Sequence, residues 1–436
     1  MSDSTSSHDF SMKKTMSSRG FFDKSKEGAH ARATYLKVFL GGTFAMVILI
    51  FTVFSLYWGS LWKTPVKNLP GWVVDFDGGS LGESITQALT TQPQGASKIS
   101  WTSIPASQFP GGPSEVASLV LDELNAGTTE RLSNSLITPN ASYSGADAMS
   151  VYAVEARSEN AFRSLIRPSV QTSLEMISRR IAAQTAQQAA NSTNLPSVLT
   201  ISAQTIVTPV SYQIVNLRPF DIPVATAVTF VGLIYQVILS FFVVMISLRA
   251  REESGFDKTL SLRGLIALRF ASSFAGYFTI SFFYTLLNVA FKVPMNRTFG
   301  HAGFIIFWML NFCGMLCLGL ALESLITLLT QAGIPFFMML WIIANIAVCS
   351  FPIQVLPSIF RYGYAAPFYN VSRSIRTIVF GTRNQVGLSF GILIAWIAIS
   401  CITLPLFQWF VRRRQQKAAH SSQNLLQEEK GSLPSS

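Results

Sequence analysis

The apolar runs of this chain are distributed unequally, with one alone near the N-terminus and five more after a long polar segment. The first run, Val38–Trp58, holds 21 uncharged residues, and Asn384–Val411 holds 28. About 20 apolar residues are enough for a helix to cross a hydrocarbon core of roughly 30 Å. Soluble domains do not keep such runs free of charge, so the sequence predicts a polytopic α-helical membrane protein with six transmembrane helices.

The runs divide the chain into a tail, an isolated helix, a polar domain, a membrane domain of five helices and a second tail. The boundaries expected for these five parts are 1–35, 36–58, 59–221, 222–411 and 412–436. The five helices of the membrane domain are expected at about 222–248, 265–291, 302–329, 334–356 and 386–411. Both tails are rich in Ser, a composition typical of disordered segments.

Basic residues indicate which side of the membrane each part occupies. Those that precede the first run, follow the last run or lie between the second and third runs are Lys24, Lys26, Arg32, Lys37, Arg249, Arg251, Lys258, Arg263, Arg412, Arg413, Arg414 and Lys417. Lys and Arg mark the cytoplasmic ends of spans. Both termini are therefore expected in the cytoplasm, the first run as an uncleaved signal anchor, and the polar domain on the exterior of the plasma membrane.

Four N-glycosylation sequons, which begin at Asn140, Asn191, Asn296 and Asn370, all fall in segments that the charges place outside. Two of them, Asn296 and Asn370, are close to predicted spans. Asn140 and Asn191 are accordingly the candidate glycosylation sites.

The polar domain alternates short strand patterns with helical ones, which predicts an α/β fold inserted between the first and second transmembrane helices. Strands are expected at Gly71–Phe76, Lys98–Ile104 and Met149–Val154, and helices at Ser84–Leu89, at Ser114–Leu124 and from Ser158 onward. The polar stretch Gln184–Asn194 is expected to fray or form a loop.

No enzyme signature is present, and no catalytic, cofactor or metal site is predicted. Asp75 and Asp77 could pair for metal or acid–base work, but without a nearby His or Gly-rich nucleotide loop they are better interpreted as turn carboxylates. Cys313 and Cys317 share a helical face, where packing between helices is favoured over metal binding. The net charge of +11 does not indicate nucleic-acid binding, because segment 59–221 holds ten basic and twelve acidic residues.

Glu323, Arg269 and Asn345 form the candidate intramembrane polar site. Glu323 lies about twenty residues into the fourth run, near its predicted cytoplasmic end, and Arg269 is its natural partner in the third run. Charged groups at this depth are costly and usually face a cavity or a partner. A functional role and a satisfied interfacial carboxylate remain equally weighted. Asn345, with Asn288 and Asn311, favours hydrogen bonds between helices over ligand binding.

One predicted exterior loop, between the fifth and sixth runs, carries Arg361, Arg373, Arg376 and Arg383, which are expected to have no acidic partners. Apolar residues from Phe368 onward recur at helical spacing. This pattern predicts an amphipathic helix at the outer interface whose Arg side chains extend to headgroups. An ordinary interfacial anchor is favoured over a role in lipid or substrate contact.

Three stretches together resemble a known family. They are Trp72–Gly79 (WVVDFDGG), Asn216–Tyr235, and Phe351–Pro357 (FPIQVLP) with Ala366–Asn370 and Arg376–Gly381. The sequence resembles the fungal nitrosoguanidine-resistance proteins, which are similar to bacterial membrane proteins with the ABC-2-type permease arrangement. The resemblance implies a plasma-membrane protein linked to drug or mutagen resistance through efflux or lipid organisation. It carries over no site residues, and any ATPase would be a separate chain.

Two functions from different classes remain open. The first is a permease-type protein, expected to need a second copy or a related membrane subunit to enclose a path through the lipid bilayer. The alternative is a non-transporting scaffold or sensor whose exterior domain binds a partner. It is favoured by the size of segment 59–221 and by the absence of a nucleotide-binding motif in this sequence.

Overall fold

The structure is a computed structural model that describes residues 65–91, 99–112, 122–124 and 127–431, with a few isolated residues before 65. The chain divides into two compact units, Met1–Leu56 and Tyr57–Ser436, and the helices and strands named below belong to the second. The predicted span Val38–Trp58 and the N-terminal tail lie almost entirely outside the described residues.

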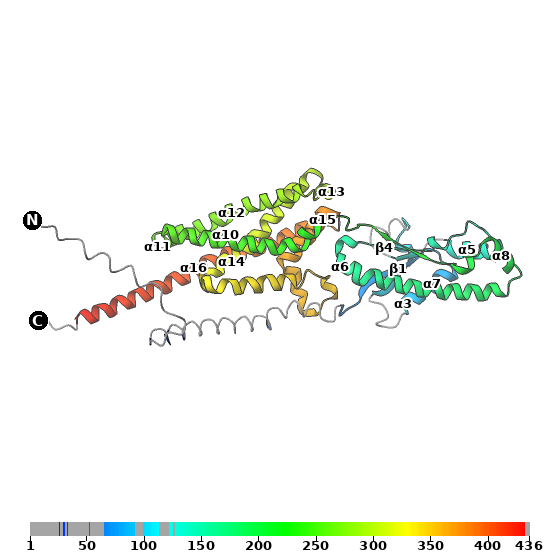
Figure 1. The fold of residues 1–436 in the computed structure, drawn as a ribbon, viewed down its shortest axis with the longest axis horizontal. Coiled ribbons are helices and arrows are strands. Elements are labelled where there is room, and N and C mark those ends of the chain that lie inside the picture. The colour runs from blue at the N-terminus through cyan, green and yellow to red at the C-terminus, as the bar shows by residue number, and fades with distance from the viewer. Residues whose placement is uncertain are drawn as a thin grey trace, which may run out of the picture. The chain divides into compact units, whose positions relative to one another are not determined.

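The first part of the described chain is an α/β domain built on a five-stranded mixed sheet (Figure 1). The strand order is β2-β1-β3-β4-β5, and all neighbours are parallel except β3 and β4. The strands are β1 (Leu69–Asp75), β2 (Ile99–Ile104), β3 (Asp122–Leu124), β4 (Met149–Ala153) and β5 (Tyr212–Asn216). Val73 and Val74 of β1 are both buried, so this inner strand is covered on both faces.

Helices cover the sheet, and the longest shields its apolar face. They are α3 (Ser80–Thr90), α5 (Thr128–Ile137), α6 (Glu159–Ala161), α7 (Arg167–Ala190), α8 (Leu195–Ile201) and α9 (Gln204–Val207). Leu174 and Ile177 of α7 pack in one cluster with Val73 and Ile85. The helix predicted at Ser114–Leu124 is wrong at its described end, because residues 122–124 form β3.

The stretch Gln184–Asn194, expected to fray, is instead helical as far as Ala190. Thr185 and Ala189 are buried on one face, so small side chains allow this last part of α7 to pack closely. The polar composition of this stretch did not indicate a buried helix face, because small side chains form such a face without large apolar residues.

Four of the described helices are long and apolar enough to cross a membrane. These candidate spans are Ala227–Ser254, Leu262–Ala290, Asn296–Ile346 and Val386–Lys417. They contain α10 (Gly232–Ser254), α12 (Leu262–Ala290), α13 (Asn296–Phe299), α14 (Gly303–Ile346) and α16 (Val386–Gly431), and the short α11 (Phe256–Thr259) connects α10 and α12. The described chain is thus mostly helical.

The long helix α14 is broken at Thr330, whose φ of 60° and ψ of 178° lie outside the helical region. Such angles are costly for a residue with a branched side chain. Gly314 lies against Val371, and Asn345, about the same number of residues beyond the break, contacts Phe368. The two halves of α14 therefore form a hairpin, with Thr330 at its tip (Figure 1).

The second half of α14 ends at Ile346, ten residues before the expected end at 356. Pro352 and Pro357 follow, and the chain continues in two short 3-10 segments, Ile353–Val355 and Ser358–Ala365. Proline has no backbone N–H to donate, so the helix could not have continued through Pro352 to the expected end.

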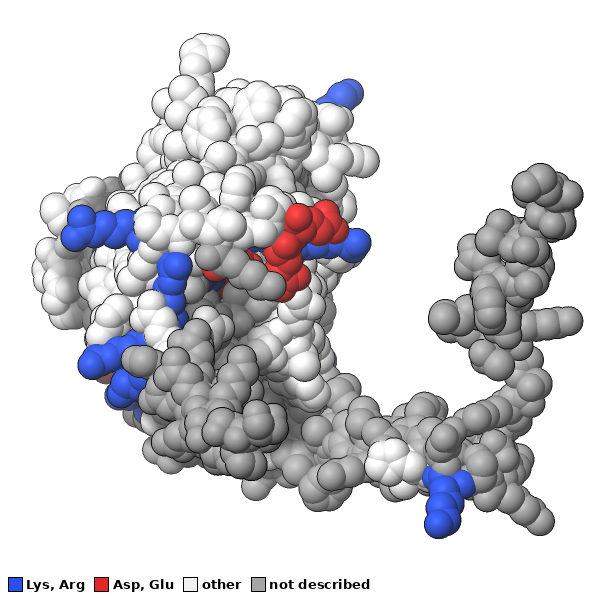
Figure 2. All heavy atoms as spheres, turned by 90° about the vertical axis from the view of Figure 1, so that its left-hand side faces the viewer, with Lys and Arg blue, Asp and Glu red and all other residues white. Residues whose placement is uncertain are grey.

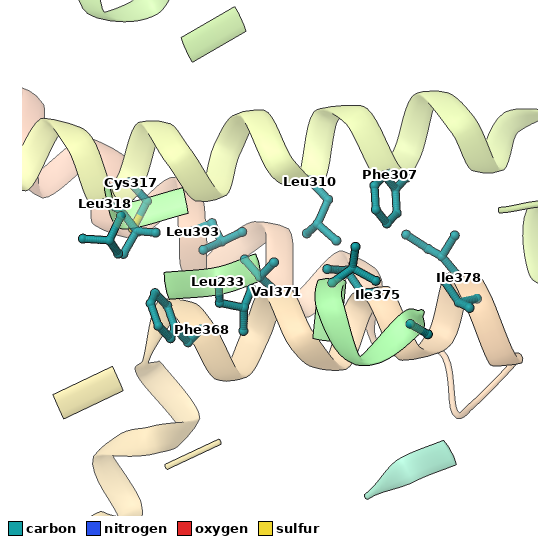
Figure 3. Close-up of a cluster of buried hydrophobic side chains, with 14 of the residues drawn as sticks. Leu233, Phe307, Leu310, Cys317, Leu318, Phe368, Val371, Ile375, Ile378 and Leu393 are labelled. Carbon is teal, nitrogen blue, oxygen red and sulfur yellow. The ribbon is translucent and has the colours of Figure 1, made fainter. Parts of the chain in front are cut away.

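The amphipathic helix predicted after these prolines exists as α15 (Pro367–Phe380), but its predicted surface position is wrong. All its residues except Tyr369 and Arg373 are buried. Phe368, Val371, Ile375 and Ile378 belong to the main core of the bundle, with side chains from α10, α14 and α16 (Figure 3). Helix α15 is therefore packed inside the protein rather than laid on its outer surface.

The sequence could not show what covers the Arg face of α15. Arg376 is buried and pairs with Glu159, a residue of the α/β domain that is more than 200 positions earlier. It also donates a hydrogen bond to the carbonyl of Ala156 at 3.0 Å. The expectation that this Arg-rich segment lacks acidic partners is therefore wrong for Arg376.

The C-terminal tail also differs from its prediction. Helix α16 continues past Val411 to Gly431, so residues 412–431 are helical where disorder was expected.

Candidate functional site

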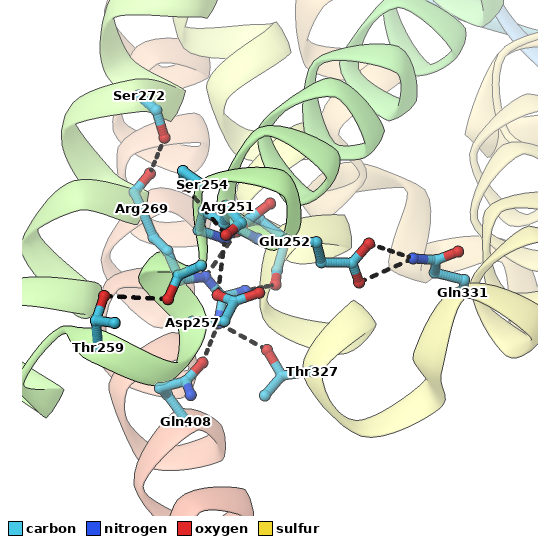
Figure 4. A network of polar contacts seen from close by, with 12 residues as sticks. Arg251, Glu252, Ser254, Asp257, Thr259, Arg269, Ser272, Thr327, Gln331 and Gln408 are labelled. Carbon is cyan, nitrogen blue, oxygen red and sulfur yellow. Dashed lines mark hydrogen bonds and ion pairs between the residues drawn. The ribbon is translucent and has the colours of Figure 1, made fainter. Parts of the chain in front are cut away.

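Four helices meet at one ionic network, whose members include Arg251, Arg269, Thr327 and Gln408 (Figure 4). Its central carboxylate is that of Glu323 on α14, which is buried. The Nε atom of Arg269 on α12 lies 2.7 Å from Glu323 Oε1, and the Nη2 atom of Arg251 on α10 lies 3.1 Å from the same oxygen. The three side chains are between 1% and 6% exposed. One carboxylate thus forms ion pairs with two guanidinium groups, each from a different helix.

Arg269 also connects the fourth helix, α16. Its Nη1 donates to Thr327 Oγ1 at 2.8 Å and to Gln408 Oε1 at 2.5 Å. Its Nη2 donates to the backbone carbonyl of Glu323. The planar guanidinium offers five donors in fixed directions, so a single Arg can hold several helices in one register.

The charges of this ionic network nearly balance. Arg251 Nε lies 3.5 Å from Asp257 Oδ1, on α11 just after the end of α10. Two cations therefore face two carboxylates, one buried and one about a third exposed. Charge balance of this kind is what allows ionised groups to remain in a poorly solvated place.

Hydrogen bonding in the network is incomplete. Within the part of the chain that the structure describes, Glu323 Oε2 and the Nε and Nη1 atoms of Arg251 are buried without a hydrogen-bond partner. A buried polar atom left unpaired costs about 1–3 kcal/mol. An arrangement that leaves three such atoms could gain hydrogen bonds by admitting water or by shifting a helix.

The sequence prediction paired Glu323 with Arg269, and the structure has that pair. Asn345 does not join them: its Nδ2 donates to the carbonyl of Trp341, and its Oδ1 accepts from the backbone N–H of Phe368. It thus satisfies a free donor in the first turn of α15, a structural role. Asn311 does connect helices as predicted, since Gln236 on α10 donates to its Oδ1.

Arg251 is the member of the network that sequence reasoning missed. Its position among other basic residues at the end of the second run made it one of several orienting charges. The distinguishing signal is spacing, because Glu253 is four residues after Arg249 and pairs with it, which leaves Arg251 on another helix face.

The end of the bundle that holds the network is rich in charge. Figure 2 looks onto this end and shows Lys and Arg at several places, with Asp and Glu in one patch. Gln331, beside the tip of the α14 hairpin, donates to both carboxylate oxygens of Glu252 at 3.0 and 3.2 Å. A polar surface here is typical of a membrane-protein end that meets water.

The sequons differ in accessibility. Asn140, Asn191 and Asn296 are exposed, whereas Asn370 is fully buried and donates to the carbonyls of Tyr364 and Ala366. Asn370 could therefore not accept a glycan in this fold.

The interpretation as a turn carboxylate is confirmed for Asp75, whereas Asp77 bonds the start of α5 instead of its own turn. Asp75 Oδ1 accepts from the backbone N–H groups of Asp77 and Gly78, and Asp77 Oδ1 accepts from the N–H of Thr129. Among the described residues no group of three His, Cys, Asp or Glu side chains could hold a metal ion.

Comparison with known proteins supports a membrane protein without defining its chemistry. The sequence model of a family described as "Protein of unknown function (DUF3533)" matches residues 43–402. An uncharacterized endoplasmic reticulum membrane protein of Saccharomyces cerevisiae is 30% identical over 213 residues, which is 48% of this chain and 41% of the relative. The match therefore spans about two fifths of that curated relative. No solved structure matches.

Proposed function

This chain belongs to the DUF3533 family of proteins of unknown function, and we propose that it is a permease-type membrane protein. In this proposal it contributes to drug or mutagen resistance through efflux or lipid organisation, as the resemblance to nitrosoguanidine-resistance proteins suggests. It is not an enzyme. The proposal counts six spans, of which α10, α12 and α16 supply one each, the two halves of α14 supply two, and the run Val38–Trp58 is predicted from the sequence to supply the sixth. Both termini lie in the cytoplasm, and the α/β domain lies outside.

The observation that carries this proposal is the convergence of α10, α12, α14 and α16 on the buried network of Glu323 and Arg269. A buried ion pair adds little to stability compared with apolar side chains of the same size. Ionisable residues within membrane helices are instead a mark of function. Three buried polar atoms of the network have no hydrogen-bond partner among the described residues. A second arrangement of the helices that gives them partners can therefore compete in free energy with this one. We assign the network the role of the cytoplasmic gate.

Transport also requires partners and an energy source. A bundle of six helices is expected to work as a homodimer or with a related membrane subunit, and a separate ATPase is a candidate partner. Mass photometry of the protein in mild detergent tests the first, since a monomer would count against it. Purification from native membranes, followed by identification of bound ATPase subunits, tests the second.

The compartment is part of the proposal. The resemblance favours the plasma membrane, whereas the curated relative is described as an endoplasmic reticulum membrane protein. Imaging of the full chain with a C-terminal fluorescent tag, beside markers of both membranes, distinguishes them.

The decisive experiment is complementation of a deletion strain with the parent chain or with Glu323→Gln. Accumulation of a panel of toxic compounds and exposure of aminophospholipids are measured at equal protein abundance. The matched control is Glu253→Gln, which removes a carboxylate that is 65% exposed at the end of α10. We expect Glu323→Gln to fail and Glu253→Gln to complement. Normal accumulation and normal lipid exposure in the deletion strain itself would refute permease function.

The second candidate is a scaffold or sensor. The contact of the α/β domain with α15, through Glu159 and Arg376, favours it, because binding of a partner to that domain could reach the bundle core. If Glu323→Gln complements fully but Glu159→Gln, which disrupts this contact, does not, the result supports the scaffold hypothesis over the permease hypothesis.

A further inference from the structure

A cavity of about 340 Å³ lies where α15 meets the α/β domain. Its walls come from α15, from the segment between α15 and α16, from the segment after α14, and from the turn at Arg157 and Ser158. The start of α16 also lines it through Leu388, twenty residues before Gln408 of the ionic network. At 1.5 Å per residue the two sites are about 30 Å apart along α16.

The cavity is cationic. Among the described residues that line it are four arginines, Arg157, Arg373, Arg376 and Arg383, and no Asp or Glu. Glu159 neutralises Arg376 from outside the lining. The other three form no ion pair with any residue in the described ranges. Uncompensated positive charge in a concave, partly buried place attracts anions strongly.

The guanidinium of Arg373 is fixed in position and has a donor available for a ligand. Its guanidinium lies over the ring of Tyr369, 5.3 Å from the centroid, and its Nη2 donates to Ser389 Oγ at 3.2 Å. Its Nε is buried and has no hydrogen-bond partner among the described residues. Arg forks of this kind suit phosphate and carboxylate oxygens, which accept bidentate hydrogen bonds.

A second cavity, of about 220 Å³, adjoins the first and is apolar. The two share Arg157, Ser158, Pro352 and Gln354 in their walls. Trp72 and Trp101 line the second, together with aliphatic side chains of the sheet and of α7, and Arg157 is the only charged residue among the described ones that line it. Trp72 is 40% exposed, an unusual state for so large an apolar side chain.

We propose that the two cavities form one site for an anionic amphiphile, a molecule with a phosphate-bearing headgroup and a hydrocarbon chain. The phosphate lies among Arg157, Arg373 and Arg383, and the chain lies against Trp72 and Trp101. Ligand sites typically combine a mainly apolar wall with a few convergent polar groups, as these cavities do together. A free phosphate would use the first cavity alone.

The inference does not depend on the proposed gate, since it uses other residues at the other end of α16. If both hold, anionic amphiphiles are the class of molecule that the permease handles. A binding measurement tests the site, and resistance tests the gate, so either can fail alone.

The experiment uses the full chain in a neutral detergent. Dioctanoyl phosphatidic acid is the probe, and inorganic phosphate and dioctanoylglycerol, which carry the head chemistry or the chains alone, are the comparison ligands. Binding is followed by microscale thermophoresis. We expect the phosphatidic acid to bind at least tenfold more tightly than either comparison ligand. Equal affinity for phosphatidic acid and phosphate would overturn the amphiphile site and leave an anion pocket, and no binding of either would overturn both.

Substitutions in each cavity test which one binds the phosphate and which one binds the hydrocarbon chain. Arg373→Gln and Arg383→Gln should each weaken the phosphatidic acid by tenfold or more. Trp72→Ser should weaken it while leaving phosphate binding unchanged. Arg361→Gln, an exposed Arg that lines neither cavity, is the control and should bind as the parent does. Arg383 is itself exposed, so its replacement tests the site even if Arg373→Gln disturbs folding. Parent affinity in both Arg variants would refute the assignment.

Discussion

Removal of the Glu323 carboxylate should destabilise the protein far more than removal of an exposed carboxylate in a pair of the same geometry. Arg269 Nε lies 2.7 Å from Glu323 Oε1, with side chains 3% and 1% exposed. Arg249 Nε lies 2.8 Å from Glu253 Oε1, with side chains 81% and 65% exposed. The donor and acceptor atoms and their distance are alike, but the second pair is exposed and joins residues of one helix, which makes it the exposed control for the buried pair between helices.

The expected magnitudes follow from solvation. Glu323→Gln leaves Arg251 and Arg269 facing a neutral amide with no water to replace the lost charge, and breaking a buried pair in this way costs about 3–5 kcal/mol. An exposed pair at i and i+4 contributes about 0.3–0.5 kcal/mol. The free energy of unfolding should therefore fall about tenfold more for Glu323→Gln than for Glu253→Gln.

A double-mutant cycle isolates the pair itself. Arg269→Gln combined with Glu323→Gln should recover part of the loss, with a coupling energy toward the upper end of the range of about 0.5–3 kcal/mol seen for contacting residues. The same cycle at Arg249 and Glu253 should couple by no more than about 0.5 kcal/mol. Unfolding in mixed micelles, followed by Trp fluorescence, supplies both energies. Equal coupling at the two pairs would refute the claim that burial makes the Glu323 network strong.

Three further perturbations have expected outcomes. Gly319→Ala should lower the unfolding temperature and reduce the free energy of unfolding by about 1–3 kcal/mol, because the new Cβ would clash with the buried hydroxyl of Tyr277. Gly391→Ala is the control and should leave the unfolding temperature unchanged, because the space around Gly391 is open. The Arg297 hydrogen bond lowers the pKa of Asp221, so the bond stabilises the fold above the ordinary carboxyl pKa and is lost as pH falls through the lowered value. Asp221→Asn should therefore cost about 0.5 kcal/mol in chemical unfolding at pH 7 and nothing at strongly acidic pH. Asn140→Gln and Asn191→Gln should each increase mobility in gels and reduce the shift caused by endoglycosidase. An unchanged shift in both variants would refute these two sites, and the absence of any shift in the parent protein would count against an exterior α/β domain.

Sequence reasoning succeeded where a local pattern has one physical outcome. Long uncharged runs must be helices in a membrane, and the four described spans cover five of the predicted regions, two of which are joined in α14. The Asp75 turn and the Glu323–Arg269 pair were also predictable, the first from local chemistry and the second from the cost of an isolated charge.

Sequence-based prediction failed where segments far apart in the chain determine whether a side chain is buried or exposed to solvent. The Arg pattern of α15 is the same for a helix lying on a membrane and for one buried beneath a domain, and only Glu159 and the carbonyl of Ala156 distinguish them. Helix α7 continued where composition suggested a loop, because its small side chains are buried against neighbours.

The sequence by itself determined that this is a helical membrane protein with an α/β domain, because the solvent needs of an apolar run and the period of a strand are local properties. Only the tertiary structure decided which charges meet. It brought Arg251 to Glu323 and joined an arginine cavity to an apolar one, since coulombic and hydrophobic contacts depend on distance in space and not along the chain.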